Sequence, residues 1–248
     1  MVHGQSFRAA WMATLALIAA FVSADARGGE RLTVVELFTS QGCSSCPPAD
    51  EYLGQLAERS DLLALSLHVD YWDYIGWKDP FADPAYTERQ RQYQKHFNIR
   101  YVYTPQMVIH GAYQTVGSKR GEVAERIKSA RALPSLDIAL AREAGGLAVR
   151  VGAAGASGVA AEDASIWLVA FDERHQTAVA RGENKGRTIV NRNVVRRFDL
   201  IGNWNGDAVA QRVPDAVADA AGGRGIAVLV QSQATGRILG AARLASNR

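Results

Sequence analysis

The stretch FTSQGCSSCPPADEYL, residues 38–53, contains both cysteines of this 248-residue chain, Cys43 and Cys46. An apolar segment rich in Val and Leu, residues 32–38, leads into it and is typical of a buried strand. Residues 47–61 follow with a helical pattern, and their two leading prolines suit the first turn of a helix. The sequence therefore predicts that the cysteine pair lies at a strand-to-helix corner, at the helix N-terminus.

The N-terminus predicts export from the cytoplasm. A basic residue, Arg8, precedes an apolar run over residues 9–22, and Ala24 and Ala26 then form an A-x-A pattern. This order is typical of a signal peptide over residues 1–26. A membrane anchor is the alternative, but the run is shorter than the ~20 residues that cross a bilayer. We expect a periplasmic or secreted protein with no stable membrane insertion after cleavage.

The net charge of +3 is mild, and no basic stripe interleaved with aromatic residues is present. Nucleic acid is therefore not an expected partner.

A structural disulfide is the first interpretation of the cysteine pair. It would stabilise the fold only weakly, since a four-residue ring contributes roughly 2 kcal/mol by loop entropy, against about 3 for fifteen residues.

Metal binding is a second interpretation of the cysteine pair. Zinc usually takes four ligands, and the histidines after residue 26 show no regular ligand spacing from the cysteines or from each other. A two-thiolate site for Cu(I) remains as an alternative, in which Cys43 and Cys46 would make the chain a non-enzymatic copper-handling protein.

Redox chemistry is the third interpretation and the one we prefer. Free N–H groups and the positive end of the helix dipole favour a thiolate at a helix N-terminus. We expect Cys43 to be the more exposed cysteine and the nucleophile, and Cys46 to resolve the mixed disulfide. A redox-active Cys43–Cys46 disulfide requires no organic cofactor.

The following elements suggest an α/β unit. Residues 61–73 read as a second buried strand, which makes a β-α-β unit with a parallel strand pair. A helix is expected from about residue 84 to 97, short strands at about 106–110 and 113–116, and a helix at about 120–131. Trp72 and Trp77 lie in or beside the long loop between the strand at residues 61–73 and the helix that begins at about residue 84. They either form a peptide-binding ledge over the cysteine corner or pack the loop onto the core.

The order strand, C-x-x-C, helix, strand, helix, and then TPQMVIHG at residues 104–111, resembles thioredoxin. The resemblance implies that Cys43 is the attacking cysteine and Cys46 the resolving one. It also implies that Pro105 is the cis-proline, and that Thr104 and Pro105 form the backbone platform for substrate.

Four longer stretches of the sequence resemble one particular protein family more closely than they resemble thioredoxin. Residues 36–50, 69–81, 103–111 and 180–196 resemble the secreted, mostly proteobacterial domain-of-unknown-function 1223 family, which is thioredoxin-like. The resemblance covers about residues 32–245. It implies the fold more than the function, because that family is itself poorly characterised.

The chain departs from thioredoxin around the cysteines. Gly42 stands where thioredoxin has a tryptophan, and Ser44 and Ser45 replace its Gly-Pro pair. Leu37 matches the position of the buried aspartate of thioredoxin. The neighbouring Glu36 is a candidate proton relay only if a bulge turns it toward the cysteines, and otherwise is a solvated or ion-paired strand carboxylate.

The pattern changes around Pro134. Alternating runs with Gly-rich turns, beginning with a hairpin signal at residues 143–146, predict a β-rich, sandwich-like unit. We expect a thioredoxin-like domain over residues 27–134 and a β-rich domain over residues 135–248. The expected function is thiol–disulfide exchange on protein thiols or disulfides, with an unknown redox partner. Alternatively the redox activity is vestigial and the β-rich domain is a binding module.

Overall fold

The computed structural model describes residues 31–215 and 225–244, so the predicted signal peptide lies outside the described residues. The strands are β1 Thr33–Thr39, β2 Leu62–His68, β3 Gln106–Ile109, β4 Tyr113–Val116, β5 Ile138–Glu143, β6 Gly146–Val151, β7 Ala164–Ala178, β8 Thr188–Trp204, β9 Val209–Pro214, β10 Gly225–Ser232 and β11 Ile238–Arg243. The helices are α1 Pro47–Ala57, the short 3-10 helix η1 Asp73–Ile75, α2 Pro84–His96 and α3 Arg120–Arg131. In these ranges no helix combines the length and the apolar character needed to cross a membrane.

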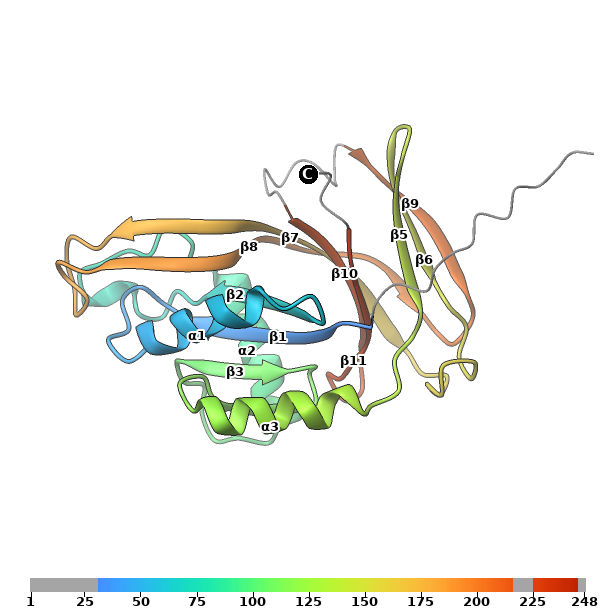
Figure 1. Ribbon diagram of the computed structural model, residues 1–248, viewed down its shortest axis with the longest axis horizontal. Helices are drawn as coiled ribbons and strands as arrows, with labels where there is room; N and C mark the ends of the chain where they lie inside the picture. The colour runs from blue at the N-terminus through green and yellow to red at the C-terminus, as the bar shows by residue number, and fades with distance from the viewer. Residues whose placement is uncertain (1–30, 216–224, 245–248) are drawn as a thin grey trace, which may run out of the picture.

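The first half of the chain forms one end of an eight-stranded sheet, in the order β2-β1-β3-β4. β1 and β2 are parallel, as the predicted β-α-β unit requires, while β3 runs antiparallel to β1 and to β4. Helices α1 and α3 pack with Val35 and Leu37 of β1 on one face of the sheet. Helix α2 packs with Val34 and Phe38 on the other face (Figure 1).

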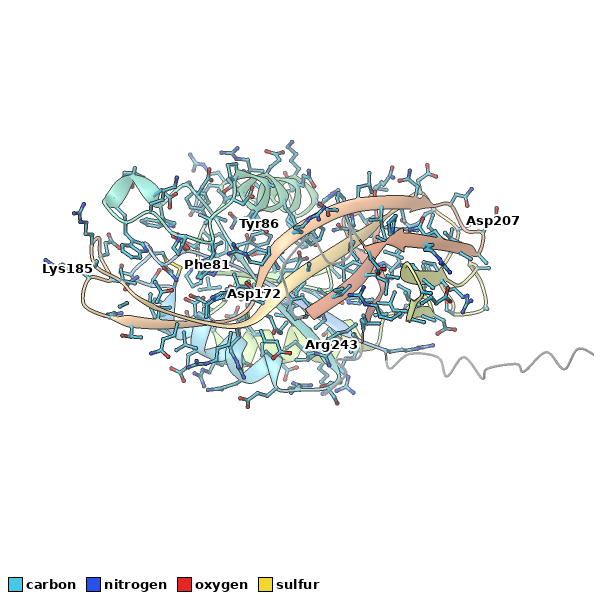
Figure 2. All side chains as sticks on the ribbon, turned by 90° about the horizontal axis from the view of Figure 1, so that it is seen from above. Phe81, Tyr86, Asp172, Lys185, Asp207 and Arg243 are labelled. Atoms are coloured by element: carbon cyan, nitrogen blue, oxygen red, sulfur yellow. A yellow bond between two sulfur atoms is a disulfide. The ribbon has the colours of Figure 1, made fainter. Side chains whose placement is uncertain are left out.

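The second half of the chain continues the same sheet. β8 pairs in parallel with β2 at Ser66 and Val194, and the order continues through β7, β10 and β11. β7 and β8 form a long antiparallel hairpin whose turn lies at the α1 end of the sheet (Figure 1). Figure 2 shows β8 running from the end marked by Lys185 to the end marked by Asp207.

A small sheet, β5-β6-β9, lies beside the far half of the large sheet. The predicted hairpin is confirmed: β5 and β6 pair antiparallel, and Gly145 in their turn has φ +82°. A shared apolar core joins Leu147 and Val149 of the small sheet to Leu168 and Val228 of the large one. The fold is therefore mixed α/β, with a large β-rich sheet and few helices.

Candidate active site at the Cys43–Cys46 disulfide

The two cysteines form a disulfide at the corner between β1 and α1, with Cα atoms 5.4 Å apart. Cys46 is the N-cap residue of α1, and proline occupies the first turn. The Cys46 carbonyl oxygen accepts hydrogen bonds from the N–H groups of Ala49 and Asp50, at 2.8 and 3.1 Å. The structure thus confirms the predicted position of the pair at a helix N-terminus.

Both cysteines are buried in this oxidised form, each with 0% exposure, whereas Ser44 and Ser45 between them are exposed. The expectation that Cys43 is the more exposed cysteine is therefore wrong. Long-range contacts contribute to this burial, because the turn between β7 and β8, residues 179–187, is hydrogen-bonded to the corner.

This turn, which we call the 179–187 cover, is hydrogen-bonded to the cysteine backbone. The buried Asn184 amide donates from Nδ2 to the carbonyl oxygens of Gln41 and Cys43, both at 2.9 Å. The Ser44 N–H donates to Glu183 Oε2 at 3.2 Å. Sequence analysis treated this segment only as part of a family resemblance, and no local signal indicated that it reaches the cysteines.

The loop between β2 and α2 approaches the corner from another side. Trp72 Nε1 donates to Thr104 Oγ1 at 2.7 Å, and Trp77 Nε1 donates to Gln41 Oε1 at 3.2 Å. A Cβ at Gly42 would lie only 3.2 Å from Trp72 Cβ, so glycine permits this close approach. The Thr104–Pro105 peptide bond is cis, as the resemblance implies.

A buried polar cluster extends this site. Asp79 Oδ2 accepts from the Gln41 N–H at 2.8 Å and lies 2.7 Å from His68 Nδ1. Gln41 Nε2 donates to Asn191 Oδ1 at 3.1 Å. Burial raises the pKa of Asp79, but His68 and hydrogen bonds from the backbone outweigh it and hold that pKa below its usual value.

Asp50 lies at the edge of the same cluster, in the first turn of α1, and is buried. Among the described residues neither of its carboxylate oxygens has a hydrogen-bond partner. Burial raises the pKa of Asp50 to about 7, against the opposing attraction of His68, and the nearby Asp79 carboxylate adds to the increase.

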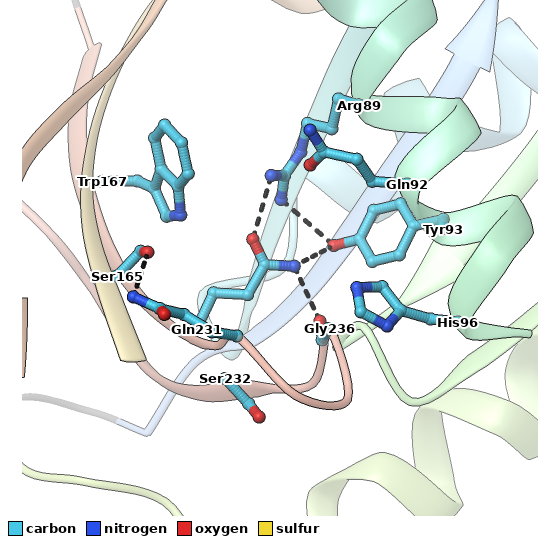
Figure 3. A pocket seen from close by; sticks show the side chains of 10 residues that line it. Arg89, Gln92, Tyr93, His96, Ser165, Trp167, Gln231, Ser232 and Gly236 are labelled. Atoms are coloured by element: carbon cyan, nitrogen blue, oxygen red, sulfur yellow. Dashed lines mark hydrogen bonds between the residues drawn. The ribbon is translucent and has the colours of Figure 1, made fainter. Parts of the chain in front are cut away.

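Glu36 faces α2, the side of the sheet away from α1. Its Oε1 lies 2.6 Å from Arg89 Nε, and the Tyr93 hydroxyl donates to its Oε2 at 2.5 Å. Arg89 and Tyr93 also bond Gln231 in the wall of a cavity of about 300 Å³ (Figure 3). Burial and the Glu36 carboxylate keep the pKa of Tyr93 well above its usual value, outweighing Arg89.

The comparisons with known proteins identify the family. The sequence profile described as "Protein of unknown function (DUF1223)" matches residues 34–231. The chain belongs to this DUF1223 family. A search of curated proteins found no match.

Two solved structures resemble this DUF1223 protein. The X-ray crystal structure of protein AGR_C_4864 from Agrobacterium tumefaciens is 30% identical with a TM-score of 0.75, over 87% of this chain and 95% of that chain. The structure titled HBP35 of Porphyromonas gingivalis is 11% identical with a TM-score of 0.52, over 89% of this chain and 76% of that chain. The second likeness concerns the fold alone.

In this DUF1223 chain the structure brings most of the predicted site residues together. Trp72 bonds Thr104, and Trp77 bonds the residue two positions before Cys43. The Glu36 carboxylate instead belongs to a network centred on α2. Sequence analysis missed Asp50. An acidic residue in the first turn of a helix is common, and nothing in the sequence nearby indicates that this one is buried.

Proposed function

We propose that this protein is a periplasmic or secreted thiol–disulfide oxidoreductase, and that β1 to α3 form a thioredoxin-like unit. The observation that carries the proposal is a C-x-x-C disulfide at the N-terminus of the helix that follows the central strand β1. The strand order β2-β1-β3-β4, with α1 and α3 on one face and α2 on the other, supports it as well.

In the reductive direction, the Cys43 thiolate attacks a substrate disulfide and a substrate thiolate leaves. The Cys46 sulfur then attacks Cys43, so the Cys43–Cys46 bond forms and the second substrate sulfur leaves. Two electrons pass from the dithiol to the substrate. In the oxidative direction the same steps run backwards with a substrate dithiol as the reductant. Protein thiols or disulfides are the proposed partners, and no organic cofactor is required.

Access to the sulfur atoms requires a movement, because both cysteines are buried. The 179–187 cover is the segment to open, since Asn184 holds it to the Cys43 carbonyl oxygen. A substrate chain could then lie against Thr104 and Pro105, with Trp72 beside them as the ledge.

The direct test is the reduction potential of the Cys43–Cys46 pair, measured by equilibration in glutathione buffers with mass-spectrometric trapping. A potential near −120 mV would indicate an oxidant, and one near −270 mV a reductant that needs an electron supply. A pair that is inert to exchange at every ratio of reduced to oxidised glutathione would overturn the proposal.

The roles of the two cysteines are tested separately. Cys46→Ser should trap a mixed disulfide between Cys43 and a substrate protein, because the resolving thiol is absent. The matched variant Cys43→Ser should trap much less. Equal trapping by the two variants would contradict the assignment of Cys43 as the nucleophile.

A further inference from the structure

Resting on the proposed thiol–disulfide exchange, we infer that Asp50 is the proton-transfer residue for Cys46. It takes the proton from the Cys46 thiol when the disulfide forms, and returns a proton when the disulfide opens. This role differs from that of Glu36, which is paired with Arg89 on the other side of the sheet.

The helix places the two groups together. Asp50 follows Cys46 by four residues in α1, and its N–H donates to the Cys46 carbonyl oxygen at 3.1 Å. Side chains four residues apart lie on the same helix face, with Cβ atoms about 5–6 Å apart. Both side chains are buried, and transfer between them requires the carboxyl oxygen and the sulfur to come within hydrogen-bond reach, directly or through one water molecule.

The surroundings of Asp50 suit a group that changes protonation state. Its two carboxylate oxygens have no hydrogen-bond partner in residues 31–215 and 225–244. The Thr39 hydroxyl and the Asn191 amide act on the carboxyl group as side-chain donors and lower its pKa, but neither reaches full hydrogen-bond geometry.

Charged groups approach Asp50 from three other elements. His68 of β2 attracts the carboxylate and Asp79 of the following loop repels it. On the hairpin side, Arg174, Arg187 and Arg192 line a groove with Asp50. The groove has a volume of about 520 Å³ and also contains Glu51 and Glu58 of α1, so it gives the proton a route to solvent.

Burial has the largest effect on the Asp50 carboxyl group, and together with the nearby groups it raises the pKa to about 7. A carboxyl group with a pKa near neutrality accepts and releases protons at comparable rates, which is the condition for efficient general acid–base catalysis. Cys46 lies four residues before Asp50, and its thiol must lose or gain a proton in each catalytic cycle.

The step balances in both directions. In resolution, the Asp50 carboxylate removes the Cys46 proton, and the Cys46 thiolate attacks the Cys43 sulfur. The Cys43–Cys46 bond forms, the bond from Cys43 to the substrate breaks, and the substrate sulfur leaves as a thiolate. In the reverse reaction a substrate thiolate attacks Cys43, and protonated Asp50 supplies the proton to the departing Cys46 sulfur.

The test uses the full mature chain, reduced, and the chromogenic aromatic disulfide dithionitrobenzoate at one equivalent. A first coloured thiolate reports attack by Cys43, and a second reports resolution by Cys46. We expect the rate of the second phase to rise with pH and to level off in the neutral range. Asp50→Asn should slow that phase by about 100-fold at pH 7 and leave its rate proportional to hydroxide.

Glu51→Gln is the matched control, because Glu51 is the next residue of α1 and its side chain is 69% exposed. It should leave both phases unchanged. Absence of the first phase in the wild type would refute the proposed function itself. A normal first phase with the same second-phase pH profile in wild type and Asp50→Asn would overturn the role of Asp50 alone.

If Asp50→Asn does not fold, the wild-type profile decides. A second phase that accelerates in proportion to hydroxide, with no inflection between pH 5 and 9, would overturn the inference. An inflection in the neutral range would support it.

Discussion

Replacing Arg89 with methionine should leave the Glu36 carboxylate buried without its cation. Glu36 has 0% exposure, and its Oε1 lies 2.6 Å from Arg89 Nε. Removing one partner of a buried ion pair typically costs 3–5 kcal/mol, because the other charge remains desolvated. The Tyr93 hydroxyl still donates to Glu36, so we expect the free energy of unfolding to fall by about 3 kcal/mol, the lower end of that range.

The assay is urea unfolding at neutral pH, followed by tryptophan fluorescence. Arg91→Met is the matched control, since Arg91 lies on the same helix, is 56% exposed and pairs with Glu88 at 3.7 Å. It should change stability by less than about 0.5 kcal/mol. A loss below about 1 kcal/mol for Arg89→Met would refute the reasoning. A separate test concerns the role of Glu36 as a proton relay. A folded Glu36→Gln variant should keep the wild-type pH profile of cysteine exchange, and a changed profile would restore that role.

Three further predictions concern the cover and two buried groups. Asn184→Ala removes two buried hydrogen bonds, each worth about 1 kcal/mol, and should speed reduction of the disulfide by dithiothreitol about tenfold or more; an unchanged rate would mean that the 179–187 cover does not limit access. The raised pKa of Asp50 means that the folded chain keeps a proton that the unfolded chain releases near pH 3.8. Stability should therefore decrease as pH rises from about 4 to 7, and Asp50→Asn should remove this decrease in urea titrations. Burial lowers the pKa of His110 to about 4, so its contribution is lost as pH falls from about 6.5 to 4, and His110→Asn should be less sensitive to acid than wild type.

Local signals in the sequence predicted much of the first half. The bounds expected for β4 and α3 match the structure, and the corner at Cys46 was placed by the apolar strand before it and the prolines after it. The β5–β6 hairpin was likewise predicted from its turn, in which Gly145 has a positive φ. These features depend on neighbouring residues, which is why a pattern along the chain suffices to find them.

The features that sequence analysis missed depend on contacts between distant residues. Asn184 bonds Cys43 across 141 positions, and no periodicity connects them. Arg89 of α2 is buried because it pairs with Glu36 of β1, across 53 positions of the sequence.

The two halves of the chain share one site. The 179–187 cover, which bonds the backbone around Cys43, comes from the hairpin that follows α3 in the second half of the chain. The turn of that hairpin reaches the cysteine end of the sheet, where Asn184 bonds the Cys43 carbonyl oxygen. Strand β8 of the hairpin supplies Asn191, which bonds Gln41 beside the disulfide. The β-rich half therefore contributes both to the surroundings of Cys43, through Asn184, and to those of Asp50, through Asn191.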